Sequence, residues 1–170
     1  MIHISGHLWL GNLTTASNEK ILRAQKITKV LTIIHDADIV GGVRDNAERL
    51  GIGHKALSVH DCKPFEDGGR IAWEILPWLK DGMDVGENAL IHCYAGISRS
   101  SSMVVAYLVW NGMSVPEALE LLINRHPIAV PHPKILASCL RPLGHALPEN
   151  YQAWVDIQWE KFEKSGSQLD

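Results

Sequence analysis

Short apolar runs along the chain have the length and the flanking residues of β-strands. Each run is a few residues long and is bounded by polar or glycine-containing stretches. The runs are 2–4, 8–10, 30–34, 54–59 and 88–92. The first two are close enough in sequence to form a hairpin. The last is almost continuously apolar, which is typical of a strand covered on both faces.

Apolar residues at helical spacing lie between and after these runs. The predicted helices are 17–25, 69–82, 101–110, a helix beginning at 114, 134–145 and 149–164. We expect Ser17 to cap the first helix and Pro77 to bend the second. Asn111-Gly112 should end the third, and Ser114 with Glu117 forms the capping box that begins the next.

The stretch 36–51 favours no single element, although residues 44–50 have the spacing of a short helix. Strands that alternate with helices, followed by helices alone, predict an α/β fold. In this fold a central, mostly parallel sheet has helices on both faces. We expect one domain over residues 1–164, which includes an amphipathic C-terminal helix at about 149–164, and a frayed tail over 165–170.

Large apolar residues on these helices are interpreted as packing residues. Trp73 and Trp78 on the helix 69–82 are expected in the core or on the surface, not as a ligand platform. Trp154, Ile157 and Phe162 give the last helix its apolar face. We therefore assign these residues to packing and expect no catalytic or ligand-binding role for them.

The composition narrows the class of protein. The 16 basic and 19 acidic residues give a formal net charge of −3, so no strong field favours nucleic acid or an anionic membrane as partner. No secretory signal is apparent and no apolar run approaches a membrane span, so we expect no stable membrane association. Three cysteines do not make a disulfide framework. We therefore expect a reducing, cytoplasmic location.

Residues 92–100, with the sequence His-Cys-Tyr-Ala-Gly-Ile-Ser-Arg-Ser, carry the candidate chemistry. They lie between a predicted strand end and a helix start, where backbone N–H groups lack intrahelical partners and can converge on an anion. Gly96 allows a tight loop, and the Arg99 guanidinium can hold two phosphate oxygens at once. The loop residues 94–99, namely Tyr94, Ala95, Gly96, Ile97, Ser98 and Arg99, are therefore predicted to bind a phosphate group.

Cys93 is predicted to be the nucleophile of this loop. Inward amides, the helix N-terminus and the Arg99 charge all favour a thiolate over a thiol. In-line attack on a phosphate monoester would give a phosphocysteine. Ser100 can stabilise the thiolate when it leaves, and His92 can orient the cysteine from behind, although a core histidine bonded to backbone carbonyls explains it equally well.

Residues 92–100 resemble the signature His-Cys-x-x-Gly-x-x-Arg-Ser/Thr of the cysteine-dependent protein-tyrosine-phosphatase superfamily. The chain is most similar to its compact dual-specificity branch, over roughly residues 1–147. The resemblance implies an aspartate general acid on a loop some thirty residues before the cysteine. Asp61, 32 residues before Cys93, fits this role, with Glu66 and Asp67 as rivals.

The resemblance also implies the substrate class. We expect hydrolysis of phosphotyrosine, and of phosphoserine and phosphothreonine, in phosphorylated proteins, without a metal or cofactor. The loop carries no lysine that would favour polyanionic head groups, but a lipid, nucleotide or small-molecule phosphate remains an alternative. A non-catalytic phosphate-binding adaptor and a sulfurtransferase fit the residues less well.

The chain departs from the family pattern in one segment. Many dual-specificity relatives carry Pro-Asn-x-x-Phe-x-x-Gln-Leu, in which the Asn braces the phosphate loop. The corresponding segment here, residues 131–139, keeps the proline and has His132 after it. This departure makes a divergent or microbial member as plausible as a close relative of the animal signalling phosphatases.

The remaining cysteines and histidines have simpler interpretations. Cys62 and Cys139 are expected to be buried small hydrophobic residues, although Cys62 could form a disulfide with Cys93 under oxidation. Nine histidines are present, but no His-x-x-x-His or Cys-x-x-Cys pair accompanies them. We therefore expect no metal site at the histidines most open to that interpretation, which are His54, His60, His126 and His132.

Overall fold

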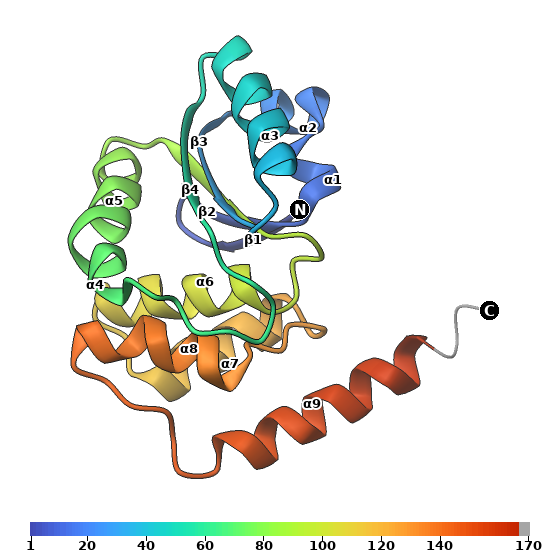
Figure 1. Ribbon diagram of the computed structural model, residues 1–170, viewed down its shortest axis with the longest axis vertical. Coiled ribbons are helices and arrows are strands. Elements are labelled where there is room, and N and C mark those ends of the chain that lie inside the picture. Colours follow the sequence, from blue (N-terminus) through green and yellow to red (C-terminus); the bar gives the residue numbers. More distant parts are fainter. Residues whose placement is uncertain (167–170) are drawn as a thin grey trace.

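The computed structural model describes residues 1–166, apart from the side-chain surroundings of residues 162, 165 and 166. A five-stranded sheet with the order β1-β2-β5-β3-β4 forms its centre (Figure 1). The strands are β1 Ile2–Ser5, β2 Leu8–Gly11, β3 Ile27–Ile33, β4 Gly53–Leu57 and β5 Asn88–His92. Strands β1 and β2 form the predicted hairpin, and every other pair is parallel.

Strand β5 occupies the middle of the sheet because both of its faces are covered. Residues 89–92 are all buried, as expected of a strand between parallel neighbours. Its pairing places His92 beside Gly11 of β2 and beside Thr32 of β3. The carboxyl ends of β2, β3 and β5 therefore meet at one edge of the sheet.

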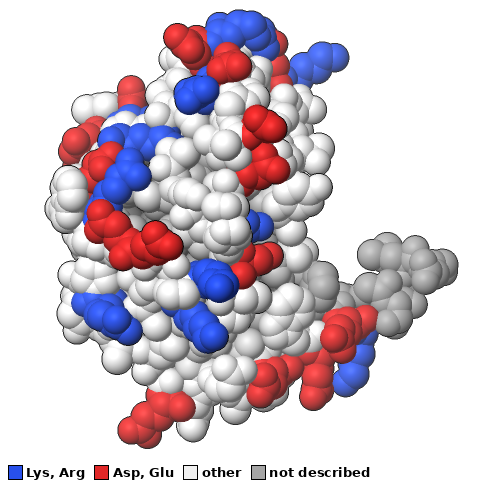
Figure 2. Space-filling model, in the orientation of Figure 1, with Lys and Arg blue, Asp and Glu red and all other residues white. Residues whose placement is uncertain are grey.

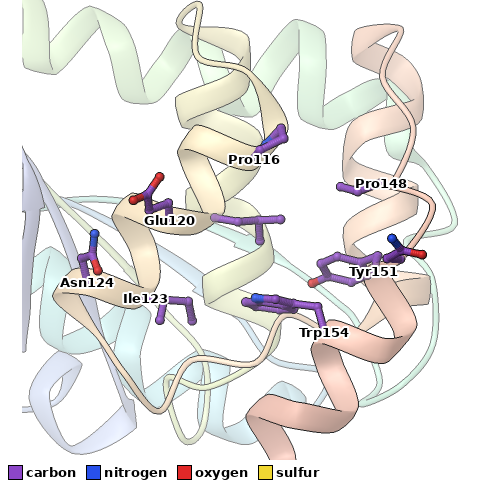
Figure 3. Close-up of a pocket in the computed structure, with 9 residues that line it drawn as sticks. Pro116, Glu120, Ile123, Asn124, Pro148, Tyr151 and Trp154 are labelled. Atoms are coloured by element: carbon purple, nitrogen blue, oxygen red, sulfur yellow. The ribbon is translucent and has the colours of Figure 1, made fainter.

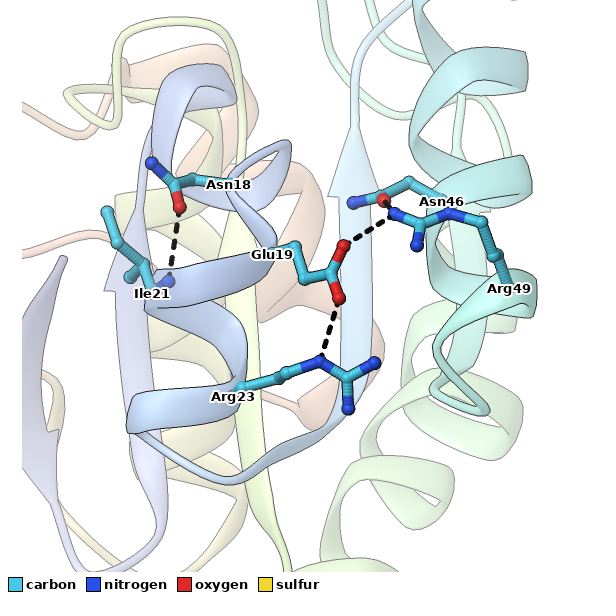
Figure 4. A network of polar contacts seen from close by, with 6 residues as sticks. All are labelled: Asn18, Glu19, Ile21, Arg23, Asn46 and Arg49. Carbon is cyan, nitrogen blue, oxygen red and sulfur yellow. Dashed lines mark hydrogen bonds and ion pairs between the residues drawn. The ribbon is translucent and has the colours of Figure 1, made fainter.

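Three helices cover one face of the sheet. They are α1 Leu13–Ala16, α2 Glu19–Ala24 and α3 Ala37–Arg49. Glu19 joins the last two, because its carboxylate accepts hydrogen bonds from Arg23 Nε at 2.8 Å and from Arg49 Nη2 at 2.9 Å (Figure 4). These bonds hold the pKa of Glu19 below its ordinary value. The network is exposed and lies on the helices, away from the sheet edge.

The other face carries the larger hydrophobic core. Its elements are α4 Gly68–Arg70, a π-helical segment Ile71–Ile75, α5 Leu76–Asp84, α6 Arg99–Trp110, α7 Val115–Arg125, α8 Pro133–Leu140 and a 3-10 turn Arg141–Leu143. Helix α6 is the centre of this layer, because residues 100–109 are all buried. It packs against α7, α8 and β5 (Figure 1).

The last helix, α9 Tyr151–Gly166, packs on α8 and then extends from the body (Figure 1). Its buried positions are Tyr151, Val155 and Gln158, with Trp154 half-buried. Ile157, which is predicted on the apolar face of this helix, does not lie on its packed face, since its side chain is 53% exposed. The packed face follows Tyr151 at helical spacing, which turns Ile157 outwards.

Most predicted elements are present, with shifts that have local causes. The first predicted helix begins at Glu19 because Asn18, not Ser17, caps it, and the short helix α1 has no counterpart among the predicted elements. Pro77 lacks an N–H for the preceding turn, and the π-helical segment lies directly before it. Helix α9 extends to Gly166, past the predicted end at 164; residues 167–170 of the predicted tail and the side chain of Phe162 lie outside the described residues.

Neither sign of charge dominates the visible surface. Figure 2 shows basic and acidic side chains interspersed on the face seen there. Within residues 1–166, no helix has the length and apolar character needed to cross a membrane. A preference for an anion therefore has to arise locally, from the geometry of one site.

Candidate active site

The segment 92–100 forms the predicted loop between strand β5 and helix α6. His92 is the last residue of β5, and Arg99 is the first of α6. Cys93 follows the strand directly and is only 2% exposed. The loop therefore lies at the carboxyl edge of the sheet, where open α/β sheets bind ligands.

Backbone carbonyls of the loop are bonded from outside. Leu13 N–H donates to Tyr94 O at 3.0 Å, His126 Nε2–H donates to Gly96 O at 3.1 Å, and Val130 N–H donates to Ile97 O at 2.9 Å. All peptide bonds of the described residues are trans, so the N–H of each following residue points the opposite way. The N–H groups of Ala95, Ile97 and Ser98 therefore point into the loop.

These inward groups are available to a ligand. Among the described residues, the N–H groups of Ala95, Ile97 and Ser98 donate to no protein acceptor. All three residues line a cleft that also contains Cys93. Helix α6 begins in the same place without a side-chain cap, so its N-terminal dipole is directed at the cleft. Three amides and a helix start thus form an anion-binding nest.

Two features require a glycine at position 96, namely its backbone conformation and the close approach of a neighbouring carbonyl. Its φ of +78° lies in the region that favours glycine, and a Cβ there would approach the Gly11 carbonyl oxygen to 2.9 Å. Its N–H donates to Cys93 Sγ at 3.3 Å. The close contact of Gly96 with Gly11 of strand β2 thus holds the loop where the Gly96 N–H can donate to Cys93 Sγ.

Ser100 provides a second polar contact to Cys93. Its hydroxyl lies 3.1 Å from Cys93 Sγ, and the residue is fully buried on the first turn of α6. The hydroxyl can donate to an ionised sulfur, as the N–H of Gly96 does. Two donors therefore converge on Sγ from the side of the helix.

Arg99 extends along the cleft towards the loop after β4. Its Nη1 donates to the Val59 carbonyl at 3.3 Å, and its Nε lies 3.6 Å from Asp61 Oδ1. The second distance is an ion-pair contact that is too long for a hydrogen bond. Within the described residues, Nε is buried and has no hydrogen-bond partner. A buried charged donor without a hydrogen-bond acceptor is costly, and an anion bound in the cleft could accept from it.

Asp61 lies at the mouth of the same cleft. Its side chain is 65% exposed, and it shares the lining with Cys93 and Arg99. The rival carboxylates lie elsewhere. Asp67 accepts a hydrogen bond from Arg70 N–H at the start of α4, and Glu66 is exposed and does not line the cleft.

The cleft has a volume of about 270 Å³. A larger hollow of about 410 Å³ lies between α7 and the start of α9, where Ile123, Pro148 and Trp154 face one another (Figure 3). That hollow has one carboxylate, Glu120, and contains no cysteine, histidine or basic residue. Its chemistry is therefore that of an apolar groove, and the reactive groups are in the smaller cleft.

His92 is held behind Cys93 by a chain of buried polar groups. Its Nδ1 lies 3.2 Å from the Cys93 carbonyl and its Nε2 lies 2.8 Å from Thr32 Oγ1, which in turn lies 2.9 Å from His54 Nε2. Burial lowers the pKa of His92 to about 4, so its ring is neutral at pH 7.

Because the His92 ring is neutral, the donor and the acceptor of each hydrogen bond among these buried groups are determined. A carbonyl only accepts, so Nδ1 of His92 carries the proton and its Nε2 accepts from the Thr32 hydroxyl. The Thr32 oxygen then accepts from His54 Nε2–H. Both histidine tautomers are therefore set by the Cys93 carbonyl.

Other sequence predictions have mixed outcomes. Cys139 is buried as expected, and burial raises the pKa of its thiol. The prediction that Cys62 is buried is wrong: it is exposed in the loop after β4, with a φ of +60°. His132 follows Pro131 as noted, and its N–H donates to Ser98 Oγ at 3.3 Å. In the described part of the chain, no three His, Cys, Asp or Glu side chains could hold a metal ion.

Several residues of the site have no signature in the sequence. Thr32, Val59, His126 and Val130 reach the loop only because strands and connectors distant in sequence end at the same edge. The sequence draws attention to His126 only as a possible metal ligand, whereas its role here is to bond a loop carbonyl. Trp159 of α9 also lines the cleft, and no local pattern connects it with the loop.

Comparison with known proteins agrees with this geometry. The family model of the dual specificity phosphatase catalytic domain matches residues 8–140. The protein-tyrosine-phosphatase MKP1 of Arabidopsis thaliana is 27% identical over 130 residues, which cover 76% of this chain and 16% of that protein. Dual specificity protein phosphatase 1 of the same plant is 29% identical over 134 residues, which cover 74% of this chain and 60% of that protein.

The fold is shared with solved structures as well. The crystal structure of human DUSP28 superposes with a TM-score of 0.69 at 19% identity, covering 91% of this chain and 97% of that one. The chain therefore belongs to the dual specificity phosphatase catalytic-domain family, and the predicted resemblance and α/β fold are confirmed. The chain spans less than two thirds of the length of the two plant relatives.

The close contact at Gly96 can be tested with a matched glycine. Gly144 has a φ of +79°, almost that of Gly96, but open space around its missing Cβ. We expect Gly144→Ala to lower the free energy of unfolding by about 1–2 kcal/mol, the cost of a left-handed conformation. Gly96→Ala should cost about 1–3 kcal/mol more from overpacking and should also weaken phosphate binding. Equal losses in urea unfolding and unchanged phosphate affinity would contradict the role of the Gly11 contact.

The neutral state of His92 predicts a pH dependence of stability. In the unfolded chain the ring takes up a proton near the ordinary histidine pKa of 6.5, whereas in the folded protein its pKa is about 4. Stability is therefore full above pH 6.5 and falls as the pH drops towards 4, by at most about 1.4 kcal/mol per pH unit from this residue. The control His92→Gln should show a shallower slope between pH 6.5 and 4 in urea unfolding. Parallel slopes would mean that His92 does not titrate in this way.

Proposed function

We propose that the chain is a protein phosphatase that hydrolyses phosphotyrosine, and also phosphoserine and phosphothreonine, through a phosphocysteine on Cys93. The observation that carries the proposal is a single cleft that contains Cys93, the inward amides of Ala95, Ile97 and Ser98, and Arg99, whose Nε has no hydrogen-bond partner among the described residues. These groups are the kinds of donor that bind the oxygens of a phosphate dianion, and the nucleophile, Cys93 Sγ, lies in the same cleft.

In the first step, Cys93 Sγ attacks phosphorus and a P–S bond forms. The ester P–O bond breaks, and its electron pair stays on the leaving oxygen, which takes a proton from the Asp61 carboxyl group. In the second step, the Asp61 carboxylate takes a proton from a water whose oxygen attacks phosphorus. The P–S bond breaks, inorganic phosphate forms, and the Ser100 hydroxyl stabilises the departing thiolate.

The choice of Asp61 as general acid rests on position. It lines the cleft beside Cys93 and contacts Arg99, whereas Asp67 caps a helix and Glu66 lies outside the lining. The other groups in the mechanism are a thiolate, amides and a guanidinium, so the reaction as written requires no metal or cofactor.

Phosphorylated proteins are the proposed substrates. The matching relatives are named as protein phosphatases, and the loop between Cys93 and Arg99 has no lysine for a polyanionic head group. A phosphate monoester of a lipid, nucleotide or small molecule is the alternative. We further propose that residues 1–164 act as one domain, and that the thiolate works in a reducing compartment such as the cytoplasm.

Replacing the nucleophile tests the proposal directly. Cys93→Ser should lower phosphate release from para-nitrophenyl phosphate and from phosphopeptides by more than about 10³-fold, because serine is not ionised at neutral pH. Binding of a phosphotyrosine peptide, followed by calorimetry, should persist. Cys62→Ser, at the other thiol of the cleft, should retain turnover. A Cys93→Ser protein that turns over at the wild-type rate would refute the mechanism.

Replacing Asp61 tests its proposed role as the general acid. Asp61→Ala should slow hydrolysis of phosphotyrosine and phosphoserine peptides by about 10²–10⁴-fold, because their leaving oxygens need a proton. Esters with good leaving groups, such as difluoromethylumbelliferyl phosphate, should be affected much less. Glu66→Ala is the matched control and should behave as wild type. If Asp61→Ala slowed all esters equally, Asp61 would not be the acid.

A further inference from the structure

Helix α9 lies beyond residues 8–140, which match the family domain, but it contributes a side chain to the cleft. Trp159 lines the cleft together with Cys93, Arg99 and His132, and it is 39% exposed there. An indole at this position places a flat apolar surface beside the phosphate site.

The helix is fixed to the phosphate loop by three consecutive residues. The Tyr151 hydroxyl donates to the Pro131 carbonyl at 2.7 Å. On either side of Pro131, Val130 N–H donates to Ile97 O at 2.9 Å and His132 N–H donates to Ser98 Oγ at 3.3 Å. The start of α9 and the loop are therefore held by the same short connector, which limits how far one can move from the other.

The register of α9 then determines where Trp159 lies. Tyr151, Val155 and Gln158 are buried, at spacings that place them on one face, and Figure 3 shows Tyr151 and Trp154 turned towards α7. Trp159 is four residues after Val155, so it lies one turn further along, next to the packed face. At this point the helix has reached the mouth of the cleft.

We infer that Trp159 is a specificity-determining residue that forms an aromatic wall for the phosphotyrosine ring. This inference rests on the proposed function. With phosphorus at Cys93 Sγ, the group attached to the ester oxygen occupies the cleft that Asp61 and Trp159 also line. A phenyl ring there can stack on the indole, whereas the short aliphatic side chains of phosphoserine and phosphothreonine offer no π-face.

The experiment compares two peptides of identical flanking sequence, one with phosphotyrosine and one with phosphoserine. Trp159→Ala should raise KM for the phosphotyrosine peptide by about 3–10-fold, the range expected for loss of one aromatic pair, and should change KM for the phosphoserine peptide less than twofold. Values of kcat should change little, because Trp159 contacts no reacting atom. Trp159→Phe should restore the phosphotyrosine KM, and Trp159→Leu should not.

A control on the same helix distinguishes the effect of the Trp159 side chain from a general effect of changing α9. Ile157→Ala removes an exposed apolar side chain that does not line the cleft, and it should leave both KM values unchanged. Equal changes for both peptides in Trp159→Ala, or no change for either, would overturn the inference. A higher kcat/KM for both peptides in Trp159→Ala would also overturn the inference, because it would mean that α9 obstructs the cleft in the wild-type protein.

Failure of the inference can be distinguished from failure of the proposed function. If the wild-type protein releases phosphate from neither peptide, the proposed function fails. The wall is then still tested by calorimetric binding of both peptides to Cys93→Ser, with and without Trp159→Ala. A selective loss of phosphotyrosine affinity supports the inference, and its absence refutes it.

Discussion

The site depends on one constraint: three carbonyls of the loop, those of Tyr94, Gly96 and Ile97, are bonded by donors outside the loop. A trans peptide directs its C=O and N–H in opposite senses, so each bonded carbonyl turns the next amide inwards. The donors are Leu13 N–H at the start of α1, and the His126 ring and Val130 N–H in the connector between α7 and α8. If these donors were absent, the loop could satisfy its carbonyls with water and the amides would have no preferred direction. The anion nest is thus formed by the tertiary structure around the loop.

The sequence predicted the elements whose causes are local. Residues 88–92 and 101–110 have the apolar patterns of a strand and a helix, and the spacing of Cys93, Gly96 and Arg99 between them marks the loop that joins the two. It could not predict Thr32 behind His92, because these residues are 60 positions apart and meet only through strand pairing. The helix after residue 149 was predicted as an element, but its position was not, since Trp159 reaches the cleft through the anchoring of Tyr151.

The mispredictions share a physical reason. Ser17 and Asn18 are both good caps, and only the position of the preceding short helix decides between them. Free cysteine is usually buried, which predicts a core position for Cys62, but this residue lies in the loop that brings Asp61 to the cleft. In both cases the local preference is real, and the connection to neighbouring elements overrides it.

The neutral ring of His92 decides where the charge of the proposed thiolate is balanced. Burial keeps its pKa at about 4, so the group behind Cys93 offers no positive charge at neutral pH. The stabilising groups, which are the Gly96 N–H, the Ser100 hydroxyl and the start of α6, lie around the loop, and the Arg99 guanidinium lies in the cleft with them. An incoming phosphate dianion would be repelled by an ionised sulfur, and Arg99 is the group of this set that carries a full charge to offset the repulsion. A charged histidine behind the sulfur would instead hold the thiolate back from the phosphorus. In the proposed mechanism, a neutral His92 with a fixed tautomer would therefore orient Cys93 through its carbonyl without competing with the substrate for the charge of the sulfur.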